Sequence, residues 1–564
     1  MRSMFASSAA SRLSCAFPSD AATLTKQTGF DILNSMNVSA VSCVVMALTA
    51  PLACASAVYV NSDVWNFFSD NELKDRGAIA AAIDADVDFY VDAGATAVFY
   101  NLNAQRALFG SKTATPLWKD VSVGEDGRPL LRGKPFVTDQ DGSRFLAMAN
   151  RARRVNELMP DFMARRYARC RARGVEMWHS MRMNDIHYTY LGNEWIPLHS
   201  DMWLDRKDLL RAWYRHSWRG EWRDNGFDYA KREVLDAHLA LMREYLLEYE
   251  SDGIELDWMR CVPLFTPGHD ESNAPVLTRF MRETRKTASE AAAKWGHPVK
   301  VAVRVPARVR EAYGVGMDVA AWAREGLVDV VVPSPRDTST EMDCDVALYR
   351  AICPKPIVLA PDVDYYCRSS DDKRYVLAFS ADIDRGFVSG WYHDGADAAY
   401  LYNHFPRHAK ERHDGYPAYI ASLGDREALA RMPRRHVFTS HAPIGEGVFP
   451  SSPYWNAVWR NCCNGCVKVN CGEGVSGRRA VVVIGAKTSL DVDVIVNSVK
   501  CAPVSLDSVC LKDLPEAKEG DTLCYVAAVV PPGVLHDGWN GVEIFNRGPV
   551  DLKSRDFVWL EVKL

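Results

Sequence analysis

Two carboxylates lie two residues apart in the stretch Ser251–Arg260, whose sequence is S-D-G-I-E-L-D-W-M-R. Apolar residues alternate there with Glu255 and Asp257, which is the pattern of a strand with one apolar and one acidic face. Ionised groups inside a protein need partners, so an acidic strand face is costly in an ordinary core. The stretch therefore predicts a short strand whose acids serve chemistry.

Two such acids are suited to the hydrolysis of a glycosidic bond. One carboxyl group protonates the leaving oxygen, while the other attacks the sugar or activates water. From a rise near 3.3 Å per residue, the Cβ atoms of Glu255 and Asp257 are expected about 6.5 to 7 Å apart. A pair could form within this strand, or with Asp362 or Asp364 across a barrel, so retention and inversion both stay open.

The elements expected to position these acids are short apolar strands, each followed by a helix or a long loop. Strand–helix alternation implies parallel pairing, and eight repeats imply a closed (β/α)8 barrel. An open, doubly wound sheet is the alternative, but no glycine-rich nucleotide loop follows the first strand. The expected strands are Val58–Asn61, Thr96–Tyr100, Val175–Met181, Gly253–Trp258, Val299–Val305, Val328–Val332, Pro356–Ala360 and Ala398–Tyr402.

Three segments are expected along the chain: a leader over 1–57, the barrel over 58–435 and a C-terminal domain over 436–564. After about Arg435, helical periodicity gives way to short strands separated by turns, which predicts an antiparallel β-sandwich. Such a module can bind a glycan or only buttress the barrel, and we expect the ancillary or buttressing role.

The leader contains a small, apolar run, Asn37–Ala57, that ends in Ala-Ser-Ala. This fits a cleaved signal peptide with a mature start near Val58, and so predicts a periplasmic, cell-surface or extracellular protein. The residues upstream are more than an ordinary n-region, so a start near Met36 and an unusual leader are both open. An N-terminal membrane anchor is the other alternative. No later stretch is long enough to span a membrane.

Cysteines cluster in the last quarter of the chain, which holds seven of the 15. Together with export, this clustering predicts disulfides. A zinc site is the alternative because Cys463 and Cys466 have ligand spacing, although no second pair follows at finger spacing. The seven are Cys462, Cys463, Cys466, Cys471, Cys501, Cys510 and Cys524.

Polar side chains follow most of the expected strands, and in such barrels the active site forms at the strands' carboxyl ends. Acids, Arg, Asn and His suit a hydroxyl-rich ligand, and we expect no cofactor. No tight histidine motif indicates a metal. The acids could instead form only structural ion pairs with arginines. Expected catalytic residues are Asp257, Glu255, Asp362 and Asp364, and expected substrate-binding residues are Asn103, Arg182, Asn184, Asp185, His187, Arg304, Asn403 and His404.

The run from Phe227 to Tyr249, followed by S-D-G-I-E-L-D-W-M-R, resembles the family-10-like glycosyl hydrolase barrels of bacterial exported proteins. M-R-M-N-D-I-H, V-R-V-P and G-A-D-A-A-Y-L-Y-N resemble the same group. The resemblance implies the barrel fold more firmly than a substrate. The strand is also similar to the D-x-x-D-x-D-x-E motif of family 18 chitinases, but Met259 stands where that family has its catalytic acid. This departure argues against substrate-assisted hydrolysis.

Composition adds one exclusion. The chain has 67 Lys and Arg against 72 Asp and Glu, a net charge of −5, and no basic block, so nucleic acid is not an expected partner. We therefore expect an exported glycoside hydrolase that acts on an oligosaccharide or polysaccharide. The alternatives are a non-catalytic, carbohydrate-binding or cell-surface barrel, and a metal-dependent hydrolase or lyase.

Overall fold

The structure is a computed structural model, and every statement below concerns the residues that it describes. These are 56–70, 72–136, 142–189, 195–218, 222–335, 339–370, 372–378, 380–403, 416–439, 464–509, 514–548, 552 and 556–564. The chain divides into two compact units, Met1–Ala53 and Cys54–Leu564, and all described residues belong to the second. The predicted leader therefore lies outside the described residues, apart from its last two positions.

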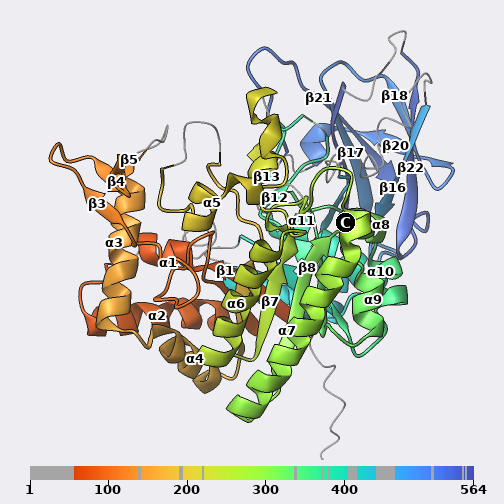
Figure 1. Cartoon of the computed structure of the whole chain (residues 1–564). Coiled ribbons are helices and arrows are strands. Elements are labelled where there is room, and N and C mark those ends of the chain that lie inside the picture. Colours follow the sequence, from red (N-terminus) through yellow and green to blue (C-terminus); the bar gives the residue numbers. More distant parts are fainter. Residues whose placement is uncertain are drawn as a thin grey trace, which may run out of the picture. The chain divides into compact units, whose positions relative to one another are not determined.

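A parallel sheet of nine strands organises the N-terminal two thirds of the second unit (Figure 1). It curls so that alternate side chains of each strand face a common interior. In spatial order its strands are β10 (Val358–Leu359), β9 (Val330–Ser334), β8 (Lys300–Pro306), β7 (Gly253–Asp257), β6 (Glu176–Arg182), β2 (Ala97–Asn101), β1 (Ala57–Asp63), β14 (Ala398–Leu401) and β11 (Asp362–Val363).

Helices connect these strands, as strand–helix alternation predicted. The long helices α6 and α7 lie next to each other beside β7 and β8 (Figure 1). The helices are α1 (Val64–Asp70), α2 (Arg76–Asp92), α3 (Gly142–Leu158), α4 (Phe162–Ala172), α5 (Asp201–Asp205), α6 (Arg232–Glu248), α7 (Ala274–Trp295), α8 (Val309–Gly314), α9 (Val319–Arg324), α10 (Val346–Ile352), α11 (Ala381–His393), α13 (Tyr416–Gly424) and α14 (Arg426–Arg431).

The two edges of the curled sheet meet in one short segment, residues 358–363, which we call the seam. Its first half, β10, pairs with β9, and its second half, β11, pairs with β14. The two halves do not pair with each other, so the hydrogen-bonded ladder is curled but not closed. Ala360 donates to Val331 on one side, while Pro361 accepts from Tyr400 on the other. The predicted seventh strand, Pro356–Ala360, is thus two short pieces placed further along the chain.

Large aromatic rings fill the interior of the curled sheet. Phe99 stacks on Trp178 at 4.8 Å between ring centroids and meets Tyr400 edge-on at 5.4 Å. Gly253 makes room for this packing, because a Cβ placed there would lie 2.5 Å from atoms of the Trp178 ring and 2.8 Å from the Lys300 carbonyl oxygen. The glycine that opens the acidic strand is thus required by the ring beside it.

Replacing Gly253 with alanine is therefore expected to destabilise the protein by about 1–3 kcal/mol, the usual cost of overpacking a core. Gly110→Ala is the matched control, since a Cβ there would meet nothing closer than 3.7 Å. Urea denaturation of both variants measures the difference. Equal stabilities for the two variants would contradict this account of Gly253.

Two antiparallel sheets occupy the C-terminal region, as the sequence predicted. One sheet has the order β15 (Arg435–Val437), β23 (Phe557–Lys563), β17 (Ala480–Ala486), β21 (Cys524–Val530) and β20 (Ala502–Val504); the other has β16 (Asn464–Asn470), β22 (Trp539–Asn546), β18 (Val492–Val496) and β19 (Val499–Lys500). β17 and β23 are buried along almost their whole length, whereas buried and less buried residues alternate in β22. The buried valines and isoleucines of both sheets belong to one core cluster.

The prediction of disulfides was wrong for the cysteines that can be examined: the nine in the described ranges are all free thiols. Instead of pairing, the thiols of Cys466, Cys471 and Cys501 each donate to a nearby backbone carbonyl. Buried cysteine behaves as a small apolar residue, so clustering along the chain did not imply pairing. Cys462, Cys463 and Cys510 lie outside the described residues. None of the described helices is long and apolar enough to cross a membrane.

Candidate active site

Strand register places the candidate acids in two layers inside the curled sheet. Ser180 lies opposite Glu255 in the β6–β7 ladder, and Arg182 lies opposite Asp257. In the β7–β8 ladder, Asp257 lies opposite Arg304. Because side chains alternate along a strand, Glu255 lies one layer deeper than Asp257, which is the last residue of β7.

The deeper layer is a hydrogen-bonded cluster around Glu255. The Tyr400 hydroxyl donates to Glu255 Oε1 at 2.6 Å, and the Ser180 hydroxyl donates to Oε2 at 2.6 Å. Asn61 adds a longer bond to Oε2 at 3.3 Å and also donates to Tyr400. Both carboxyl oxygens of Glu255 are therefore engaged by the protein itself.

Burial and the neighbouring Asp257 raise the pKa of Glu255 from 4.5 to about 7. Between these values the native state holds a proton that the unfolded chain has released, so this group makes stability fall as pH rises through that window. Glu255→Gln is neutral at every pH and is expected to reduce the fall by about 1–3 kcal/mol. Denaturant unfolding at intervals between pH 4.5 and 8 measures the slope.

The control for this slope is the exposed Glu473→Gln variant, which we expect to follow the wild type. An unchanged slope in Glu255→Gln would show that Glu255 does not titrate in this window.

The outer layer is an ion-pair bridge at the carboxyl ends of the strands. Arg304 Nη1 donates to both Asp257 oxygens at 3.0 and 3.2 Å, while its Nη2 donates to Asp362 at 2.7 Å. The Tyr402 ring lies 3.5 Å from the Arg304 guanidinium carbon, and the Tyr402 hydroxyl lies 3.5 Å from Asp257. A single guanidinium thus joins β7 to β11.

Asp364 lies two residues beyond Asp362 in the same segment. Burial and the charge of Asp362 raise the pKa of Asp364 well above its ordinary value, although Arg304, Arg260 and a hydrogen bond from Asn403 lower it. Asn403 has a φ of 59°, a left-handed backbone conformation that asparagine tolerates. Burial and Asp362 therefore favour the neutral, protonated form of Asp364. Asp257, by contrast, faces the positive charge of Arg304.

A second network lies beside the first, on β1, β6 and the loops that follow. Arg182 pairs with Asp63 at 2.8 Å and with Asp185 at 3.2 Å. His187 Nδ1 lies 2.8 Å from Asp185, and the guanidinium of Arg260 contacts the other ring nitrogen. Burial raises the pKa of Asp185, but His187, Arg182 and Arg260 together hold it well below its ordinary range.

Access to solvent differs sharply between these groups. The four candidate acids are no more than 4% exposed, whereas the His187 side chain is 40% exposed. A cavity of about 110 Å³ reaches this second network and is lined by residues that include Asn103, Arg182 and Asp185. Stretches that follow β6, β9 and β14 in the chain, 190–194, 336–338 and 404–415, fall outside the described residues, and so does His404.

Two of the predicted substrate-binding residues hold the backbone. The amide of Asn103 bonds with the backbone of Arg182 in both directions. The amide of Asn184 joins the Cys261 carbonyl to the Phe227 amide. Both asparagines therefore fix the loops around the site, and Asn103 also lines the cavity beside the second network.

Sequence reasoning missed five residues of the two layers and the second network, although the sequence contains a signal for them. Asn61 and Asp63 alternate at the end of β1, and Tyr400 and Tyr402 alternate at the end of β14, as Glu255 and Asp257 do in β7. The first strand was expected to end at residue 61, which left Asp63 out. Ser180 precedes Arg182 by the same spacing. The alternation rule, applied to every strand, identifies all five.

No group of three or more His, Cys, Asp or Glu in the described ranges has the geometry of a metal site. The metal-dependent alternative therefore has no ligand set among the side chains that can be examined. Carboxylates, arginines and tyrosine hydroxyls compose the site instead.

The fold and site define an α/β protein with a curled parallel sheet, additional antiparallel sheets, and buried carboxylates bridged by arginine at the strand ends. No family model matches the sequence, and no curated protein matches it. The resemblance to family-10-like hydrolases and to chitinases therefore remains a prediction.

Solved structures match this chain at low sequence identity and with TM-scores from 0.30 to 0.38. A maltogenic α-amylase of Thermotoga neapolitana matches 90% of this chain and 99% of its own, at 9% identity and a TM-score of 0.35. α-L-fucosidase isoenzyme 2 of Paenibacillus thiaminolyticus matches 67% and 49%, at 11% identity and a TM-score of 0.38. A cycloisomaltooligosaccharide glucanotransferase of Paenibacillus sp. has 7% identity and a TM-score of 0.30; the chain covers 56% of its length.

Proposed function

We propose that the protein is a glycoside hydrolase that cleaves an oligosaccharide or polysaccharide by carboxylate catalysis. One observation carries the proposal: two buried acids, Asp257 and Asp364, lie near Arg304 at the strand ends and differ in their surroundings. Asp257 accepts two hydrogen bonds from the guanidinium, whereas burial and Asp362 raise the pKa of Asp364. An acid whose neutral form is favoured, beside a carboxylate held by a guanidinium, is an arrangement that suits acid–base catalysis.

In this proposal Asp364 donates its proton to the glycosidic oxygen as the bond to the anomeric carbon breaks. Asp257 either attacks that carbon or removes a proton from the water that does. Glu255, one layer deeper and fully hydrogen-bonded, and Asp362, held by Arg304, position these two groups. Arg182, Asp185 and His187 extend the site toward solvent and would bind sugar hydroxyls.

We further propose that the curled sheet is a (β/α)8 barrel whose seventh strand is the seam, and that residues 436–564 form a β-sandwich domain. Export, with cleavage after Ala57, is proposed from the apolar run Asn37–Ala57 alone, since the described cysteines supply no disulfide to support it.

A non-catalytic glycan-binding protein is the second candidate, and one observation favours it. The acids are almost completely buried, and Arg304 already binds both Asp257 and Asp362. Such a buried ion-pair network also serves as a purely structural bridge.

A panel of neutral and acidic oligosaccharides, incubated with the full chain and analysed for new reducing ends, tests the proposal. We expect hydrolysis of at least one substrate, with activity that persists in the presence of a chelator. Binding without turnover of any panel member supports the second candidate. Activity that is lost with the chelator and restored by a metal ion supports the metal-dependent alternative.

A further inference from the structure

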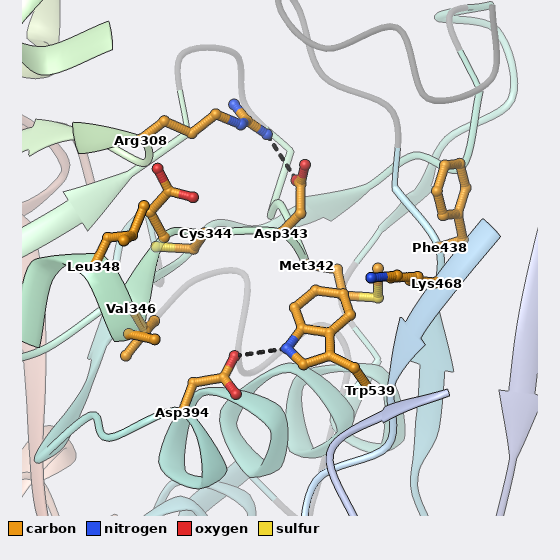
Figure 2. Close-up of a pocket in the computed structure, with 12 residues that line it drawn as sticks. Arg308, Met342, Asp343, Cys344, Val346, Leu348, Asp394, Phe438, Lys468 and Trp539 are labelled. Atoms are coloured by element: carbon orange, nitrogen blue, oxygen red, sulfur yellow. Dashed lines mark hydrogen bonds and ion pairs between the residues drawn. The ribbon is translucent and has the colours of Figure 1, made fainter. Parts of the chain in front are cut away.

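A second cavity, of about 360 Å³, lies where the loop before α10 faces the four-stranded C-terminal sheet (Figure 2). We call it the side pocket. Its size is within the usual range for ligand sites, and it shares no residue with the candidate active site. Figure 2 shows Lys468, Phe438 and Trp539 on one side and Arg308, Val346 and Leu348 on the other.

Trp539 lies on the outer face of its sheet. In β22 the residues at 540, 542 and 544 are buried, while those at 539, 541 and 543 lie on the other face and are partly buried; Trp539 also packs against the edge of the core. The indole nitrogen donates to Asp394 at 3.2 Å, and Asn470, opposite Trp539 in the ladder, donates to the same carboxylate oxygen at 2.9 Å. An indole held by its nitrogen presents a fixed apolar ring.

Lys468 lies on the same sheet face, next to Trp539. It pairs with Gly541 in the β16–β22 ladder, so Trp539 is its diagonal neighbour. Gly541 has no side chain, and a Cβ placed there would meet nothing closer than 3.9 Å. Lys468 is exposed and forms no ion pair with any residue of the described ranges. The register of β16 and β22 thus leaves space between the Trp539 ring and the Lys468 ammonium group.

Acids line the opposite wall, but each is already engaged. Asp343 pairs with Arg308 at 2.7 Å, and Asp345 accepts from the Val309 amide at 3.2 Å. Arg308 also contacts Glu341, so its charge is shared within the wall. The remaining lone pairs of these carboxylates can accept hydroxyl protons without a cation being required.

We propose that the side pocket binds a residue of a neutral glycan, with the sugar's C–H face on Trp539 and its hydroxyls between Lys468 and the carboxylates. An amphipathic ring suits a ligand with one apolar face and a hydroxyl rim. An acidic sugar would meet Lys468 but also Asp343, Asp345 and Asp394, while a cation would find those acids already engaged. The choice of glycan rests on the proposed function, whereas the location rests on the pocket alone.

Isothermal titration of the full-length Asp257→Asn variant with cello-, malto-, laminari- and xylohexaose tests the proposal without turnover. We expect at least one hexasaccharide to bind. Trp539→Ala, added to this background, should weaken that binding at least tenfold, since buried aromatic anchors dominate interfaces. Lys468→Met should weaken it about three- to tenfold, and Gly541→Val, which fills the space beside the ring, should also weaken it.

Lys518→Met, another exposed lysine of the C-terminal region outside the pocket, is the matched control and should bind as the parent does. Trp539→Phe keeps a ring without the anchoring nitrogen, and should bind more tightly than Trp539→Ala if both variants fold. No binding of any hexasaccharide, binding confined to acidic oligosaccharides, or binding unchanged by Trp539→Ala and Lys468→Met would each overturn the proposal. Hexasaccharide binding that depends on Trp539, in a protein that hydrolyses no glycan, would reject the proposed function alone.

Discussion

Asp257→Asn is expected to lower kcat/KM for the best substrate of the panel by at least ~10³-fold while leaving the fold intact. Asparagine has nearly the same shape and keeps one oxygen for Arg304 Nη1, so the bridge to Asp362 persists. It supplies neither a nucleophile nor a base. Initial rates on purified protein, with near-ultraviolet circular dichroism as the check on folding, measure the effect.

Two companion variants sharpen this result. Asp364→Asn removes the proposed acid, so it should slow natural glycosides far more than aryl glycosides, whose leaving groups need no proton. Asp384→Asn is the control for loss of a buried carboxylate elsewhere, since Asp384 lies in α11 and accepts a hydrogen bond from Tyr419. Undiminished turnover in Asp257→Asn would reject its catalytic assignment.

Arg304→Met is expected to reduce the free energy of unfolding by about 3–5 kcal/mol, which is the usual cost of breaking a buried ion pair on one side. The substitution leaves Asp257 and Asp362 buried without their shared partner. It also removes the charge over the Tyr402 ring. Guanidinium denaturation at pH 7 measures the loss.

Neutralising the two carboxylates that lose their shared partner should restore part of the lost free energy of unfolding. The triple variant Arg304→Met, Asp257→Asn, Asp362→Asn is expected to be more stable than Arg304→Met alone. A loss of under about 1 kcal/mol in Arg304→Met, with no recovery in the triple variant, would mean that the bridge contributes little to folding.

The pattern of apolar residues predicted most strands of the sheet. A strand that buries one face has alternating apolar residues, and a strand that buries both faces has a continuous apolar run. Seven of the expected strands fall within two residues of the strands observed, and Gly253–Asp257 differs only at its last residue. The seam was harder to predict. Its pairing changes from one neighbour to the other at Pro361, and no local pattern distinguishes that change from the end of a strand.

For the candidate site, the sequence predicted a cluster of acids with Arg304 but not the depth of each acid. Glu255 and Asp257 look equivalent on one strand face, yet Glu255 accepts short hydrogen bonds from the hydroxyls of Ser180 and Tyr400, whereas Asp257 is held mainly by Arg304. Depth depends on how neighbouring strands are staggered, which is a property of pairing between distant segments. The cysteines of the described ranges show the same limit, since closeness along the chain did not bring their thiols together.

Arg304 also links strands that the ladder leaves unpaired. β8 and β11 are not hydrogen-bonded neighbours in the sheet, so the ion pair between Arg304 and Asp362 cross-links β8 to the seam through the interior. The same guanidinium holds Asp257. The candidate site and this cross-link of the seam therefore depend on one side chain.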